Sequence, residues 1–178
     1  MATKTDWADS LRREQLDQIQ QYCLGNNITW VSVVGYQSSA DQALQKAGVD
    51  LIINDRKIQL KNARFDGGVI QLEVDSVGIG KRDGWVYHTQ ADQLWWYYEQ
   101  QHRIIWWDWP RLQQWFVQNE TSILTGGKLT EQSTNRGGQI WYSRLLTYKR
   151  HLLPEDSRGH VLDNYNFLDL IKKSLPRN

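Results

Sequence analysis

Alternating apolar and polar positions in the first half of the chain predict a β-hairpin. In the segment 48–61, a mostly apolar run at 49–53 precedes a polar turn at 54–56, and polar and apolar residues alternate over 57–61; this is typical of two short antiparallel strands. β-Branched and aromatic residues favour extended backbone. On this basis further strands are predicted over 28–34, 69–75, 95–98 and 104–107.

Apolar residues at helical spacing predict helices before and after these strands. The first helix runs over 6–24, with Thr5 or Asp6 as its cap and Gly25 after its end. Shorter helices are predicted over 38–46, 108–119 and 161–175. The order of elements indicates an α/β fold, with a mixed central sheet flanked by helices.

One acidic residue lies among the apolar positions of the first helix. Glu14 falls within a stripe that contains Trp7, Leu11, Gln18 and Tyr22. A buried carboxylate is costly unless it is paired or binds a metal. Glu14 is therefore either a site residue or an edge glutamate that contacts a neighbouring Arg12, Arg13 or Gln18.

The amino-acid composition narrows the classes of protein to which this chain can belong. A chain of 178 residues with 40% apolar residues is long enough for one domain with a real core, and its net charge is +1. Its single cysteine, Cys23, excludes an intramolecular disulfide and a cysteine-rich metal site. The four histidines are scattered, so zinc is not expected. The polar start and the absence of a long apolar run predict a cytoplasmic protein without a membrane span.

The hairpin brings together three polar side chains. Gln59 and Lys61 point to the same face of their strand, and the hairpin places Asp50 across from them. A carboxylate, an amide oxygen and an ammonium group suit a hard cation and a phosphate. The alternative is an ordinary solvated sheet face. Glu73 and Asp75 on the next strand are either substitute ligands or part of such a face.

These residues carry a family resemblance. The series Glu14, Asp50, Gln59 and Lys61 resembles the PD-(D/E)XK nuclease superfamily, in which a helix glutamate precedes a strand aspartate and an acid-x-lysine motif. The glutamine at the second acidic position is similar to the variant in bacterial group I intron homing endonucleases. The run 87–98, in which Ala91-Asp92 leads into an apolar strand, also resembles a later core segment of the superfamily. The resemblance covers residues 6–118.

The resemblance implies a restriction-endonuclease-like core and a role for each of the four residues. Asp50 is the main ligand of Mg²⁺, for which Mn²⁺ could substitute. Glu14 reaches the same metal directly or through water, and Gln59 supplies a neutral oxygen. Lys61 positions the attacking water or neutralises charge on the phosphate. One missing carboxylate implies weaker metal binding, because ligand charge sets affinity for hard cations.

The C-terminal part differs in charge from the rest. Residues 121–178 contain nine basic and five acidic residues, a net charge of +4. We therefore expect a nuclease core over 1–120 and a basic extension over 121–178. The polar stretch 126–138 is either a ribbon that reads DNA bases or a solvated loop. The glycine-containing segment 78–84 is expected to be a mobile basic loop. The candidate DNA-binding residues are Lys81, Arg82, Lys128, Arg136, Arg144, Lys149 and Arg150.

Taken together, the residues and the resemblance predict a Mg²⁺-dependent, site-specific endonuclease of the homing type. Its partner is double-stranded DNA, and cutting both strands implies a homodimer or homotetramer. A Holliday-junction resolvase and a restriction endonuclease with the same core are alternatives. A nucleic-acid-binding protein that no longer cuts is another, because glutamine replaces the second acid.

Overall fold

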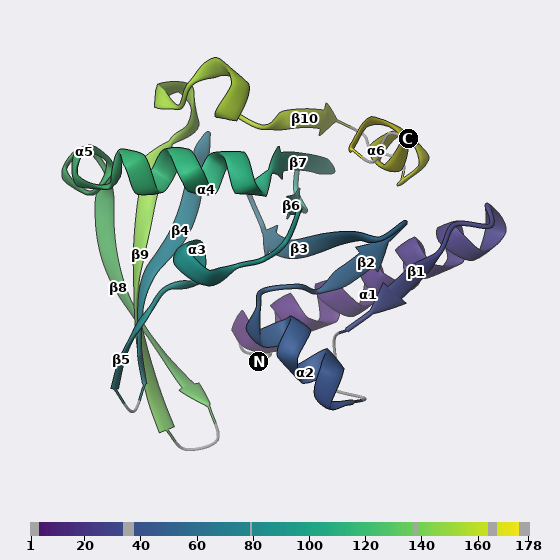
Figure 1. Cartoon of the computed structure of the whole chain (residues 1–178), viewed down its shortest axis with the longest axis horizontal. Coiled ribbons are helices and arrows are strands. Elements are labelled where there is room, and N and C mark those ends of the chain that lie inside the picture. The colour runs from purple at the N-terminus through teal and green to yellow at the C-terminus, as the bar shows by residue number, and fades with distance from the viewer. Residues whose placement is uncertain (1–3, 34–37, 79, 137–138, 164–166, 175–178) are drawn as a thin grey trace. The chain divides into compact units, whose positions relative to one another are not determined.

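The chain in the computed structural model divides into two units, each built on its own sheet (Figure 1). Unit 1 comprises residues 1–66, 91–108 and 159–178, and unit 2 comprises residues 67–90 and 109–158. The structure describes residues 4–33, 38–78, 80–136, 139–163 and 167–174. The expected boundary at residue 120 coincides with neither unit, since the chain returns to unit 1 at residue 159.

Unit 1 contains a six-stranded mixed sheet in the order β1–β2–β3–β6–β7–β10. β3 and β6 run parallel, and the other neighbours run antiparallel. This arrangement confirms the predicted mixed sheet of an α/β protein. The strands are β1 (Trp30–Ser32), β2 (Leu51–Ile53), β3 (Arg56–Ala63), β6 (Gln93–Tyr98), β7 (Arg103–Asp108) and β10 (His160–Asp163).

Three helices belong to unit 1: α1 (Lys4–Gly25), α2 (Ser39–Lys46) and α6 (Phe167–Ser174). α1 and α6 share one apolar cluster with the sheet, to which α1 contributes Leu16, Ile19 and Cys23. A buried leucine or isoleucine side chain stabilises the fold by about 1.5–3 kcal/mol. Burial also raises the pKa of the Cys23 thiol. Within the described ranges, no helix is both long and apolar enough to cross a membrane.

The turn between β2 and β3 lies where the sequence predicts it but has two residues, because Arg56 of the expected turn 54–56 already belongs to β3. Ile53 pairs with Arg56, and the intervening Asn54 and Asp55 have φ angles of 47° and 65°. Asparagine and aspartate tolerate this left-handed region better than most residues, and a turn of this kind matches the twist of the flanking strands. The turn therefore fixes the register of the hairpin.

Unit 2 contains a four-stranded antiparallel sheet in the order β5–β4–β9–β8. Ile70, Leu72 and Leu146 on these strands are buried, as are Trp109 and Phe116 on α4. The strands are β4 (Val69–Gly78), β5 (Gly80–Asp83), β8 (Lys128–Arg136) and β9 (Gln139–Lys149). The helices are α3 (Trp85–His88), α4 (Trp109–Gln118) and α5 (Glu120–Gly126), followed by the short 3₁₀ turns η1 (Arg150–Leu152) and η2 (Glu155–Ser157).

Two sequence-based expectations about elements are wrong. Residues 80–83 of the expected loop 78–84 form β5, whose backbone pairs with β4. The predicted C-terminal helix over 161–175 begins later, because Val161 and Leu162 pair with Ile105 and Ile104 of β7. Pairing with a distant strand overrides the local helical pattern at this point.

Glycine is required where α3 begins. A Cβ atom at Gly84 would lie 1.9 Å from the carbonyl oxygen of Glu73. The Gly84 N–H also donates a hydrogen bond to the carbonyl oxygen of Val74 at 3.0 Å. A side chain cannot be accommodated without moving the backbone of β4.

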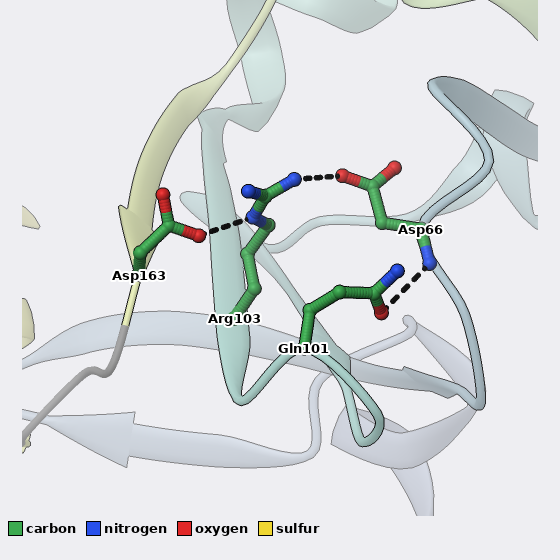
Figure 2. Close-up of polar contacts among 4 residues, drawn as sticks. All are labelled: Asp66, Gln101, Arg103 and Asp163. Atoms are coloured by element: carbon green, nitrogen blue, oxygen red, sulfur yellow. Dashed lines mark hydrogen bonds and ion pairs between the residues drawn. The ribbon is translucent and has the colours of Figure 1, made fainter.

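An arginine in β7 joins three segments of unit 1 (Figure 2). Arg103 donates hydrogen bonds to Asp163 of β10 at 2.5 Å and to Asp66, which follows β3, at 2.8 Å. These hydrogen bonds raise the pKa of the guanidinium group. The Asp66 side chain is only 2% exposed, and its backbone N–H donates to Gln101 Oε1 at 3.1 Å.

We predict that Arg103→Met lowers the free energy of unfolding by about 2 kcal/mol, because the buried Asp66 carboxylate loses a cationic partner. This figure is below the full cost of breaking a buried pair, since the arginine is 30% exposed. Urea denaturation followed by tryptophan fluorescence measures the change. Asp163→Asn is the control: Asp163 is 56% exposed, and we expect a loss below about 1 kcal/mol. Equal losses in the two variants would contradict the assignment of the main contribution to Asp66.

Candidate functional site

Asp50 is held against β3 at two points beside Gln59. It immediately precedes β2, and its backbone N–H donates to the carbonyl oxygen of Ile58 at 2.8 Å. Its Oδ2 atom accepts a hydrogen bond from the backbone N–H of Leu60, also at 2.8 Å. The two contacts lie on either side of Gln59, so the carboxylate and the carboxamide are neighbours. Asp50 is only 6% exposed.

Gln59 contains a buried oxygen that is unusual in a folded protein. The residue is 4% exposed, and its Oε1 atom has no hydrogen-bond partner among the residues that the structure describes. A buried acceptor without a partner carries a desolvation cost of about 1–3 kcal/mol. A metal ion, or a bound water that donates a hydrogen bond, would remove that cost.

Lys61 lies on the same face of β3 as Gln59, as the strand alternation predicts. Ile58, which precedes Gln59, and Leu60, which lies between Gln59 and Lys61, point to the opposite face, where they belong to the apolar cluster with α1. Lys61 is partly buried, and the parallel register places it beside Trp96 of β6. Asp50, Gln59 and Lys61 therefore come together at one end of the β2–β3 hairpin.

Glu14 does not lie in the buried stripe of α1, and the expectation that it does is wrong. It is exposed, and it accepts a hydrogen bond from Gln18 Nε2 at 3.4 Å. The buried positions are Leu16, Ile19 and Cys23, so the inward face is rotated from the predicted one. The contact with Gln18 agrees with the alternative expectation, in which Glu14 is an edge glutamate that contacts a neighbouring side chain.

Gln15, the neighbour of Glu14, is the buried polar residue of this helix. It is 4% exposed, and neither Nε2 nor Oε1 has a hydrogen-bond partner in the described part of the chain. Sequence reasoning missed it. The signal was the helical spacing of Leu16, Ile19 and Cys23, which places position 15 at the edge of the same face.

The donor set fits a hard cation with few protein ligands. Asp50 offers a carboxylate and Gln59 a neutral oxygen, and Mg²⁺ is commonly bound through one or two carboxylates with waters and substrate phosphates. Among the described residues, no group of three or more His, Cys, Asp or Glu side chains is arranged to hold a metal. Water and phosphate would therefore supply most of the ligands.

Of the two alternative ligands on β4, Asp75 has another role. Asp75 is 6% exposed and forms an ion pair with Arg144 of β9, its cross-strand neighbour. It is therefore not part of a solvated face. Glu73 is partly buried. A β-bulge lies between Glu73 and Asp75.

The candidate DNA-binding residues of unit 2 do not form one surface. Alternation along β9, together with its pairing to β8, places Arg144 on the opposite face of the sheet from Lys128 and Lys149. Lys128 and Lys149 are exposed, whereas Arg150 is partly buried. The backbones of the remaining three candidates lie in strands, but their side chains are outside the described residues: Lys81, Arg82 and Arg136.

A comparison of the chain with protein-family models, with curated protein sequences and with solved structures finds no match in any of the three. The chemistry of the site therefore rests on the arrangement of Asp50, Gln59 and Lys61.

We predict that Gln59→Met raises the free energy of unfolding by about 1 kcal/mol in the presence of EDTA. The substitution replaces an amide whose buried oxygen has no partner among the described residues by an apolar side chain of similar size. Urea denaturation measures the change.

Gln93→Met is the matched control, because Gln93 is 8% exposed and its Oε1 atom accepts a hydrogen bond from Trp95 Nε1 at 2.8 Å. This variant should lose about 1–2 kcal/mol, since it leaves a buried indole N–H without that acceptor. A loss of stability in Gln59→Met as well would mean that the Gln59 amide stabilises the fold.

Proposed function

We propose that this protein is a Mg²⁺-dependent DNA endonuclease that hydrolyses phosphodiester bonds with an activated water. The observation that supports the proposal best is the pairing of a fixed carboxylate, Asp50, with the unpartnered buried oxygen of Gln59. Lys61 on the same strand face adds the positive charge that a phosphate requires. The resemblance to PD-(D/E)XK nucleases supports the same assignment.

Each residue has a distinct task in this proposal. The Leu60 N–H fixes the orientation of the Asp50 carboxylate, which would act as the anionic ligand of the cation. When bound, Mg²⁺ supplies Lewis-acid polarisation of the phosphate and lowers the pKa of a coordinated water. Gln59 contributes oxygen without charge. Lys61 orients the attacking water or neutralises a non-bridging phosphate oxygen.

Within the nuclease class we propose a site-specific enzyme of the homing type, acting on double-stranded DNA inside the cell as a homodimer or homotetramer. The support is the glutamine variant of the motif together with the charge of +4 over 121–178. A Holliday-junction resolvase or a restriction endonuclease would use the same three residues. These alternatives differ in the DNA that is cut, and the test includes each substrate.

Asp50→Asn should abolish Mg²⁺-dependent cleavage, with a reduction of at least about a thousandfold, and leave DNA binding unchanged. Asparagine keeps an oxygen that can accept the Leu60 N–H, whereas alanine would leave that buried N–H without its acceptor. The measurement is cleavage of pooled linear duplexes and a four-way junction, alongside a binding assay in Ca²⁺.

The control for this variant is Asp55→Asn in the turn of the same hairpin. Asp55 is exposed, and asparagine tolerates its positive φ, so full activity is expected. Discrete cuts in duplex support the homing-type or restriction enzyme, and cuts in the junction alone support the resolvase. Binding without cutting by the wild-type protein supports a binding protein that has lost its activity.

Gln59→Glu should tighten Mg²⁺ binding by about tenfold, because a second carboxylate increases the ligand charge beside Asp50. Isothermal titration calorimetry with Mg²⁺ in the absence of DNA measures this change. An unchanged Mg²⁺ affinity in Gln59→Glu would remove Gln59 from the ligand set without excluding Asp50.

A further inference from the structure

Unit 2 contains a pocket of about 330 Å³ whose residues are not used by the proposed nuclease site. Ligand-binding pockets in proteins begin at about this size. The lining combines aliphatic side chains with four polar residues. It consists of Val74, Asp75, Tyr87, Glu120, Leu124, Leu129 and Arg144.

The polar lining forms two pairs within the same unit. Arg144 of β9 donates hydrogen bonds to the Asp75 carboxylate, which is 6% exposed. The Tyr87 hydroxyl of α3 donates a hydrogen bond to Glu120 Oε1 of α5. Each pair joins two different elements, so the positions of the charged groups are set by the fold and not by one flexible side chain.

The charges of the pocket do not cancel. The Arg144 guanidinium compensates Asp75, whereas Glu120 has a neutral partner, and it makes no ion pair with any of the residues that the structure describes. Among the lining residues that the structure describes, one negative charge is therefore left uncompensated, beside an aliphatic wall formed by Val74, Leu124 and Leu129.

We propose that this pocket binds a guanidinium or ammonium group at the end of a short alkyl chain. The cation pairs with the Glu120 oxygen that Tyr87 leaves available, and charge-assisted hydrogen bonds of this kind are about twice as strong as neutral ones. The alkyl chain lies along the three aliphatic side chains. A free polyamine or agmatine has this chemistry, and so does an arginine or lysine side chain of another protein. The pocket is independent of the nuclease site, because none of its residues belongs to that site.

The test is calorimetric titration of the full chain with agmatine and with N-acetyl-arginine amide, which represent the two sources. Chemical-shift mapping in ¹⁵N-labelled protein locates the bound probe. We expect binding of at least one probe at Tyr87, Glu120 and Leu124. Tighter binding of agmatine indicates a free amine, and tighter binding of the arginine derivative indicates a side chain of a partner.

Variants separate this proposal from a structural role of the polar pairs. Glu120→Gln should weaken binding by about tenfold or more, because it removes the charge but keeps an oxygen that accepts the Tyr87 hydroxyl. Glu155→Gln, an exposed acid of the same unit outside the lining, should bind as wild type.

Three results would overturn the proposal. The first is the absence of shift changes at the pocket with either cation. The second is equal affinity in Glu120→Gln and wild type. The third is preferential binding of guanosine or cytidine, which would indicate a nucleobase pocket. If Glu120→Gln fails to fold, Leu124→Trp is the second test. Leu124 is partly buried in the aliphatic wall, and a tryptophan there should fill the pocket and abolish binding. Because the pocket shares no residue with the nuclease site, DNA cleavage by these variants neither supports nor contradicts the proposed cation binding.

Discussion

The register of β3 between β2 and β6 is the constraint on which the candidate site depends. The two-residue turn fixes β3 against β2, and Asp92 fixes it against β6. The Asp92 N–H donates to the carbonyl oxygen of Lys57 at 2.7 Å, and its Oδ2 atom accepts the Lys57 N–H at 2.8 Å. A slip of one residue would turn Gln59 and Lys61 into the apolar cluster and expose Leu60. The apolar core and the candidate site therefore both require this register of β3.

The parts of the site that could be predicted from sequence are local ones. Asn54-Asp55 specifies its own turn, and alternation then places Gln59 and Lys61 on one face without knowledge of the rest. The face of α1 could not be predicted in the same way, because polar residues outnumber apolar ones along the helix and Gln15 occupies a buried position. The position of β10 depends on pairing with β7, which is about 55 residues away in sequence and has no local signal.

Buried amides without partners distinguish the region around β3 from the rest of unit 1. Gln15 on α1 and Gln59 and Asn62 on β3 each have a buried amide oxygen without a partner among the described residues. Several tryptophan N–H groups are also unpartnered, but an indole buries a large apolar surface that offsets the loss of one hydrogen bond. An amide has no comparable compensation. Sequences that break a local rule in this way often do so at functional sites.

The ion pairs of Arg103 connect the architecture of unit 1 with the insertion of unit 2 in the chain. Asp66 is the last residue before the chain first enters unit 2, and Asp163 lies in the strand formed after its second and last return to unit 1, at residue 159. Arg103 contacts both, so one side chain holds the exit and the return at the same sheet. Asp66 follows β3 by only three residues. Loosening this contact would therefore act first on the C-terminal end of the strand that carries Gln59 and Lys61, which makes Arg103 a structural support of the candidate site as well as of β10.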